Sequence, residues 1–178
     1  MDQKELAEVG VLGTLQDDDP ATLEGIHSRL RDNFRRYWGY GYGVLSPARD
    51  RLLEVGHIEP AATGDERYVI TTSGVDRLRD LLRSPLEEGT VIDIDQRHRL
   101  VIRVGFLHHL PPGDQADVLA EMEDRLREER ESWLQRFSAA DGDADTRGYR
   151  ADMADLIVRI IDSHLEWIEG VSPPTAVD

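Results

Sequence analysis

Cysteine is absent from this sequence of 178 residues, so disulfides, thiolate nucleophiles and cysteine-ligated zinc or iron–sulfur sites are all excluded. Lysine is almost absent too: of the 21 basic residues one is Lys4, which leaves twenty arginines. Together with 36 acidic residues, this composition is typical of a high-GC genome or of a halophile, in which surface carboxylates keep the chain soluble in salt.

Long apolar runs are absent as well. No stretch approaches the roughly 18 uninterrupted apolar residues of a membrane span. The first ten residues, MDQKELAEVG, have neither the basic region nor the apolar core of a signal peptide. The apolar content of 39% is nevertheless enough to build a packed core. We therefore expect a folded, cytoplasmic protein without a membrane partner.

The acidic charge of −15 is distributed unevenly along the chain. Residues 1–85 carry 11 basic and 15 acidic side chains, a net charge of −4, whereas residues 86–178 carry 10 and 21, a net charge of −11. Residues 29–51 alone hold six arginines and two aspartates, a net charge of +4. This segment is either a solvated charged face or a nucleic-acid contact. Acids more than about 10 Å away do not cancel its local positive field at moderate salt.

The first 85 residues predict three helices, a hairpin and a further helix, which is the order of a winged helix-turn-helix. We expect Asp19 to cap the second helix with Pro20 in its first turn. Gly56 is expected to end the third helix in a left-handed conformation, and Thr72 or Ser73 to cap the fourth. The predicted segments are 4–16, 20 onward, 43–55, 57–59 paired with 67–71, and a last helix to residue 83.

Residues 86–170 predict a helical domain, and residues 171–178 a flexible tail. One helix, expected at 112–138, carries a heptad seam, and another, expected at 148–169, has an apolar face too wide to leave in water. The helical domain of a single chain is too thin to bury both apolar surfaces, so we expect this domain to form a homodimer. The expected interface residues are Leu119, Met122, Leu126, Trp133, Leu156, Ile160 and Trp167.

Residues 43–58 resemble the recognition helix of the PadR family of transcriptional regulators, in register and without a gap. The segment 67–74 is similar to the strand and helix start that close the family's wing. FLHHLPPGDQADVL and HLEWIEG are similar to the C-terminal dimerisation domain of its longer-tailed branch. The positions that carry the resemblance are Gly43, Leu45, Pro47, Ala48, Arg51, Leu52, Glu54, Gly56 and Ile58, then Tyr68, Ile70, Thr71 and Gly74.

The resemblance implies a mainly helical protein with a small hairpin, in which a winged helix-turn-helix precedes a helical dimerisation domain. It further implies a DNA-binding homodimer, usually a repressor, that a small molecule releases from an inverted-repeat operator. The tryptophans favour a small, apolar or aromatic effector. The sequence departs from the family at Ser46, Arg49 and Leu53 of the recognition helix and at the acidic wing residues Asp65 and Glu66.

The expected DNA contacts fall into two groups. Arg49 and Arg51 are expected to reach base edges, with Arg51 exposed and making no contribution to the core. Other arginines are expected nearer the phosphate backbone, and the aromatic residues of YWGYGYG to contact sugars, line a ligand site or pack the linker. The expected DNA-binding set is Arg35, Arg36, Tyr42, Ser46, Arg49, Arg51 and Arg67.

Catalytic and metal sites are not expected. His108 and His109 form a poor chelate, even with His98, because neighbouring histidines on a helix point in different directions. Ser163 and His164 do not complete a nucleophilic triad, and no glycine loop has the residues of a phosphate site. We therefore expect no metal, no cofactor and no enzyme. The alternative to a DNA-binding regulator is a winged-helix scaffold that binds effectors or proteins and binds DNA only weakly.

Overall fold

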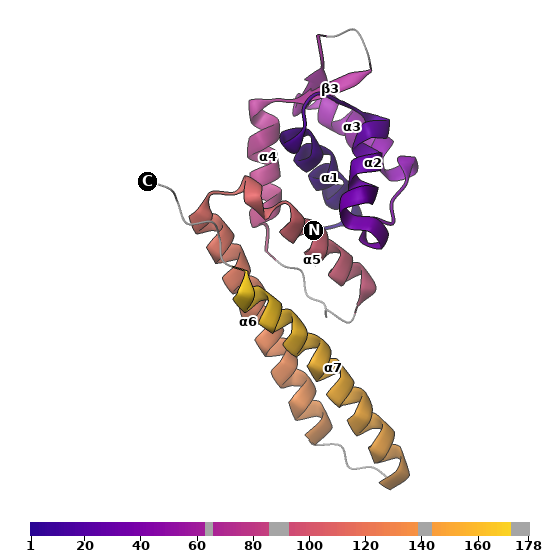
Figure 1. The fold of residues 1–178 in the computed structure, drawn as a ribbon, viewed down its shortest axis with the longest axis vertical. Helices are drawn as coiled ribbons and strands as arrows, with labels where there is room; N and C mark the ends of the chain where they lie inside the picture. The colour runs from indigo at the N-terminus through magenta and orange to yellow at the C-terminus, as the bar shows by residue number, and fades with distance from the viewer. Residues whose placement is uncertain (63–65, 86–92, 139–143, 172–178) are drawn as a thin grey trace. The chain divides into compact units, whose positions relative to one another are not determined.

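The computed structural model describes residues 1–62, 66–85, 93–138 and 144–171 (Figure 1). The chain forms two compact units, one of Met1–Glu87 with His98–Pro111 and the other of Glu88–Arg97 with Pro112–Asp178. Contacts thus divide the chain differently from the expected boundary at residue 85, because residues 98–111 pack with the N-terminal helices. Of the expected flexible tail, residues 172–178 lie outside the described residues.

The first unit has the element order of a winged helix-turn-helix, so the predicted fold class is confirmed. Three helices are followed by a hairpin and a fourth helix, and a fifth helix returns to pack on them. The elements are α1 (Gln3–Asp17), β1 (Ala21–Thr22), α2 (Leu23–Phe34), the short 3-10 helix η1 (Arg35–Tyr37), α3 (Tyr42–Glu54), β2 (Ile58–Pro60), β3 (Arg67–Ile70), α4 (Thr72–Arg83), α5 (Ile94–Gly105) and the 3-10 helix η2 (Leu107–His109).

The wing is a three-stranded antiparallel sheet in the order β1-β3-β2. The hairpin was predicted, and its register pairs Ile58 with Ile70 and Pro60 with Tyr68. The edge strand β1 was not predicted: it has two residues, and Ala21 pairs with Tyr68. This strand fixes the start of α2 against the wing.

Helix α1 lies at the centre of the first unit, where it is buried on nearly every side. Its glycines allow large rings to approach closely. A Cβ atom on Gly10 would lie 2.6 Å from the Trp38 ring, and one on Gly13 would lie 2.5 Å from the Phe106 ring. Phe106 also packs on Phe34, with 5.2 Å between ring centroids. Residues 98–111, which include most of α5, are therefore part of the winged-helix unit.

Two predicted helix starts were wrong. The second helix does not begin with Asp19 and Pro20, because the strand β1 intervenes and Thr22 caps α2 by accepting a hydrogen bond from Gly25 N at 3.0 Å. The cap of α4 is Thr71, one residue before the expected position, and it accepts from Gly74 N at 3.1 Å. The expected end of α3 is confirmed, since Gly56 has a φ of +73°.

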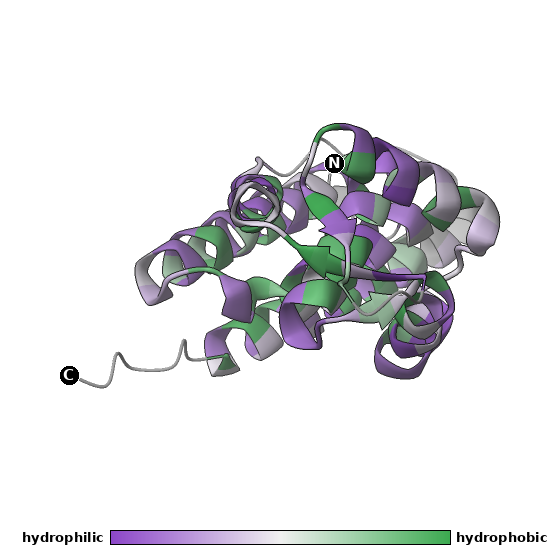
Figure 2. Ribbon diagram, turned by 90° about the horizontal axis from the view of Figure 1, so that it is seen from above, coloured by the Kyte–Doolittle hydropathy of each residue, from purple (hydrophilic) through white to green (hydrophobic). Residues whose placement is uncertain are grey.

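The second unit consists mainly of two long helices, α6 (Pro112–Ser138) and α7 (Ala144–Gly170), which pack on each other. Their ion pairs set an antiparallel register, because Arg130 Nε lies 2.6 Å from Asp162 Oδ1 and Arg127 pairs with Glu169 at 3.7 Å. Helix α7 begins four residues before the expected position 148. Hydrophilic and hydrophobic residues are interspersed along the helices of the chain (Figure 2).

Candidate nucleic-acid interface

Helix α3 corresponds to the expected recognition helix and begins at Tyr42, one residue before the expected start. Leu45, Ala48 and Leu52 are buried and attach the helix to the core. The opposite positions are exposed and follow one another at steps of four, three and four residues. This exposed face consists of Gly43, Pro47, Asp50 and Glu54. It carries two acids and no arginine.

Arg49 lies beside that face and ties α3 to the wing. Its Nε donates to Asp50 Oδ1 at 2.9 Å, and one terminal nitrogen lies 3.4 Å from the Tyr68 hydroxyl. The guanidinium carbon is 5.8 Å from the Tyr68 ring centroid, within cation–π range. Burial acts to lower the pKa of Arg49, but the hydrogen bonds to Asp50 and Tyr68 hold it above the ordinary value. Arg49 therefore stays charged and has a structural role.

Arg51 differs from the expectation of an exposed residue without packing partners. Its Nε lies 3.4 Å from Glu8 Oε1 of α1, while Arg77 of α4 binds the other oxygen, Glu8 Oε2, at 2.9 Å. Glu8 is only 12% exposed, so this carboxylate links three helices inside the unit. The Arg51 side chain is 37% exposed, so it contacts α1 and solvent together.

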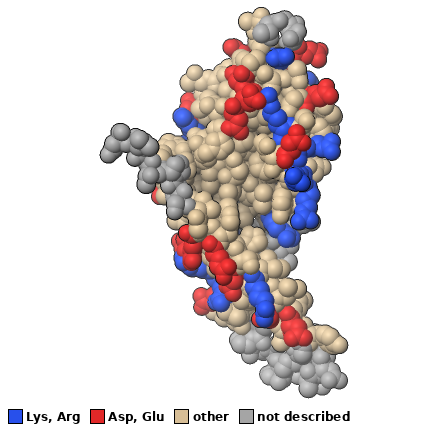
Figure 3. Space-filling view, viewed as in Figure 1, with Lys and Arg blue, Asp and Glu red and all other residues tan. Residues whose placement is uncertain are grey.

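Three other arginines are exposed at the end of α2 and in η1. Within the described parts of the chain, no ion pair engages Arg31, Arg35 or Arg36. Arg36 lies over the neighbouring Tyr37 ring, with 5.8 Å between guanidinium carbon and ring centroid. Basic side chains crowd the edge of this unit on the side where α2 lies (Figure 3). We call Arg31, Arg35 and Arg36 the arginine edge.

The remaining expected DNA contacts lie near the start of α3 and on the wing. Tyr42 is 45% exposed, and its ring is 4.7 Å from that of His27. Ser46 is half-buried on α3, and Arg67 is exposed as the first residue of β3, next to Tyr68. Of the acidic wing residues, Glu66 is exposed and Asp65 lies outside the described residues.

Half of the arginines in the predicted positive segment are engaged in ion pairs. Of the six arginines in residues 29–51, Arg29 is held by Asp18, Arg49 by Asp50 and Arg51 by Glu8. The three that remain are those of the arginine edge. The sequence signal that indicates them is local, because α2 ends in closely spaced arginines before a turn.

In the second unit, α7 has apolar residues on two faces. One face is buried and includes Ala154, Ile157, Val158, Ile161 and Ile168. The other carries apolar side chains at heptad spacing, with Met153 45%, Leu156 58% and Trp167 45% exposed. We define the α7 stripe as Tyr149, Met153, Leu156, Ile160 and Trp167.

The expected interface residues of α6 are more buried than those of α7. Leu119, Met122 and Leu126 are buried within the single chain, and Trp133 is half-buried. Leu156 and Trp167 are well exposed, and Ile160 is half-buried between them. The exposed apolar surface available to a partner therefore lies on the α7 stripe.

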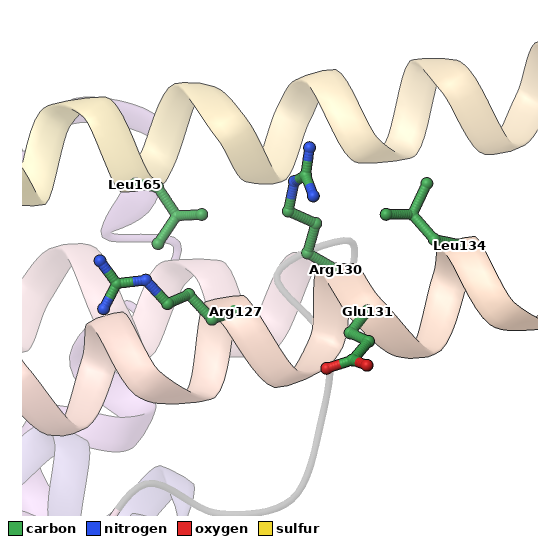
Figure 4. A pocket seen from close by; sticks show the side chains of 5 residues that line it. All are labelled: Arg127, Arg130, Glu131, Leu134 and Leu165. Atoms are coloured by element: carbon green, nitrogen blue, oxygen red, sulfur yellow. The ribbon is translucent and has the colours of Figure 1, made fainter.

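A shallow pocket lies between α6 and α7 (Figure 4). Leu165 of α7 and Arg130 of α6 point into the space between the helices, whereas Glu131 points away. The guanidiniums that line the pocket already have acidic partners, since Arg127 pairs with Glu123 and Glu169.

Ser163 and His164 hydrogen-bond to carbonyls of their own helix, Arg159 O and Ile160 O. Those two side chains are therefore not positioned as a nucleophile and base.

The first unit is thus a winged helix with an exposed arginine edge at the end of α2 and in η1. No protein-family model matches the chain, and no curated protein matches it significantly. In the part that the structure describes, no helix is both long and apolar enough to cross a membrane.

Among solved structures, the chain is similar to the transcriptional regulator PadR of Bacillus subtilis. The crystal structure of that protein is 16% identical, with a TM-score of 0.44, and the match covers 96% of this chain and 94% of that one. Its complex with p-coumaric acid is 16% identical (TM-score 0.43, 93% and 95% covered). Its complex with operator DNA is 15% identical (TM-score 0.39, 92% and 95% covered).

Proposed function

We propose that this chain is a DNA-binding transcription regulator of the PadR type rather than an enzyme. The observation that carries the proposal is the arginine edge at the end of α2 and in η1 of a winged helix. Its guanidiniums are exposed and have no acidic partner among the described residues, so they are available to phosphates. Tyr42 at the start of α3 and Arg67 on the wing are further exposed residues of the same unit.

The acidic pairing on α3 favours a particular mode of binding. Arginines of the edge supply phosphate contacts and affinity, while Tyr42 and Ser46 at the beginning of α3 are the residues offered to base edges. Arg49 supports this arrangement by holding α3 against β3. Arg51 contributes indirectly, because its ion pair with Glu8 fixes the orientation of α3 relative to α1.

Self-association follows from the α7 stripe. Large apolar side chains exposed at heptad spacing are stabilised when a second copy covers them. A twofold dimer presents two winged helices to an inverted repeat whose half-sites lie roughly 34 Å apart. Light scattering on the intact chain should give twice the monomer mass. Leu156→Glu should return the monomer, whereas Glu166→Gln on the same helix should not; dimers that persist in Leu156→Glu would place the interface elsewhere.

We further propose that the regulator is a repressor released by a small aromatic or apolar compound. Trp167 is exposed and Trp133 half-buried, so both can report on such a ligand through their fluorescence. A phenolic compound that shifts the emission and also dissociates the DNA complex would support release. A compound that shifts the emission without weakening the complex would be a ligand but not an inducer.

The DNA-binding proposal is tested by a gel shift with the DNA upstream of the chain's own gene. The expected result is a complex that survives competition by random duplex at low salt. Loss of the complex to an equal mass of random duplex, with the protein folded by circular dichroism, would refute sequence-specific binding.

A second candidate is a winged-helix module that binds effectors or proteins and DNA only weakly. The exposed acids of α3, Asp50 and Glu54, favour it, because carboxylates facing the major groove repel phosphate. Glu66 on the wing adds to this repulsion. Under this alternative the chain gives no preference for upstream DNA at any salt concentration, while self-association persists.

A further inference from the structure

Three metal-binding side chains meet where the end of α1 approaches η2. Asp17 comes from the last turn of α1, and His108 and His109 from η2, more than ninety residues further along the chain. The His108 Nε2 atom lies 2.7 Å from Asp17 Oδ1, and His109 Nε2 lies 3.2 Å from the same oxygen. All three ligand atoms lie within 4.8 Å of one another, and all three residues belong to the first compact unit.

The expectation that His108 and His109 form a poor chelate assumed a regular helix and considered only His98 as a third residue. In η2 the two rings instead turn to the same side, with 4.0 Å between their centroids. Asp17 then closes the set from α1. The adjacency of the two histidines in the sequence gives no sign of this third ligand.

His109 is held in the orientation that a metal ligand requires. Its side chain is only 9% exposed, and its ring hydrogen-bonds to the backbone of Gly13. Its Nε2 has no hydrogen-bond partner among the described residues, so the bond to Gly13 must come from Nδ1. A neutral ring that donates through Nδ1 presents a lone pair at Nε2. A backbone carbonyl on the other nitrogen is the usual second-shell support of a histidine ligand.

The contact between His109 Nε2 and Asp17 Oδ1 is short but lacks the geometry of a hydrogen bond. A lone pair and a carboxylate oxygen at this distance repel each other unless positive charge lies between them. When one metal ion binds both atoms at about 2.1 Å, the oxygen lies well off the lone-pair axis of the nitrogen. The positions of His109 Nε2 and Asp17 Oδ1 agree with this geometry. His108 offers a third ligand atom from the exposed side.

We propose that Asp17, His108 and His109 form a binding site for a divalent first-row transition metal ion, with zinc as the best fit. Two imidazoles and one carboxylate suit zinc, cobalt or nickel, whereas magnesium and calcium prefer oxygen ligands. His108 is 54% and Asp17 37% exposed, so water can enter and complete a tetrahedral shell. The ion would fasten the end of α1 to the segment that precedes α6 in the chain.

The competing explanation is a hydrogen-bonded staple, in which His108 donates its Nε2 proton to Asp17 and no metal binds. The two explanations differ in what titration with metal shows. In the metal site His108 Nε2 ligates the ion, so added metal binds stoichiometrically and stabilises the chain. In the staple, metal has no effect on the chain.

The test is titration of the full chain, freed of metal by a chelator, with Co²⁺ followed by Zn²⁺. We expect one Co²⁺ per chain, with the visible absorption of a tetrahedral site, and its displacement by Zn²⁺. Both His108→Gln and Asp17→Asn should weaken binding about tenfold or more, and both positions are exposed enough to keep the fold. The matched control is His164→Gln on α7, which removes another histidine and should leave binding unchanged.

Two results would overturn the proposal. One is a wild-type chain that takes up no stoichiometric Co²⁺ or Zn²⁺ at micromolar concentration. The other is metal binding that persists unweakened in both His108→Gln and Asp17→Asn. A melting temperature that falls in both variants under chelator, with no metal uptake by the wild type, would establish the staple instead. None of these measurements depends on DNA binding.

Discussion

Replacing Arg31 and Arg36 together by glutamine tests whether the arginine edge contacts phosphates. Each guanidinium that neutralises a phosphate adds about 0.9 to the slope of log K against log salt. Losing both should therefore make the slope shallower by about 1.8. Between 50 and 200 mM salt, a fourfold change, the wild type should lose about 12-fold more affinity than the variant. Arg35 is kept, because its φ of +48° makes any exchange there a backbone test as well.

Fluorescence anisotropy with a labelled upstream duplex, measured at several salt concentrations, gives this slope directly. The matched control is Arg125→Gln with Arg159→Gln, which removes the same charge from the second unit. We expect the control to keep the wild-type slope. An unchanged slope in the edge variant, or an equal change in both variants, would refute the assignment of phosphate contacts to the arginine edge.

The elements of the winged helix were predictable because their signals are local. Val75, Leu78, Leu81 and Leu82 repeat with helical spacing, and they define α4 without knowledge of its neighbours. Gly56 likewise marks the end of α3 through its own backbone conformation. The strand β1 has no such signal. Its two residues become a strand only because β3, more than forty residues later, provides the pairing partner.

The charged site was predictable in composition but not in pairing. Residues 29–51 have an excess of arginine whatever the fold, and this segment contains the arginine edge. Whether a given arginine is available depends on acids that approach it in three dimensions. Glu8 precedes Arg51 by 43 residues, and Asp17 precedes His108 by 91. A single sequence does not reveal either contact, so it could not predict that Arg51 pairs with Glu8 or that Asp17 lies beside His108 and His109.

Three further substitutions test the packing and electrostatics of the winged-helix unit. Glu8→Gln should lower the free energy of unfolding by about 1–2 kcal/mol in urea, because two half-exposed guanidiniums lose their carboxylate; no change would mean that the links to α3 and α4 carry no stability. Gly74→Ala should cost about 3 kcal/mol, since its Cβ would lie 2.0 Å from a backbone oxygen, whereas Gly113→Ala on α6, with open space around it, should gain up to about 1 kcal/mol; similar stabilities for the two variants would contradict the packing around α4. Asp50→Asn should strengthen DNA binding, because Asp50 is 62% exposed on the face of α3 and repels phosphate while it holds Arg49. Arg49 keeps its contacts with Tyr68, so the stronger binding comes from the lost repulsion and not from a new phosphate contact. Stability should change by less than about 1 kcal/mol, as for other exposed ion pairs, so the effect can be assigned to binding. Unchanged or weaker binding by a folded Asp50→Asn protein would mean that this face of α3 does not approach the duplex.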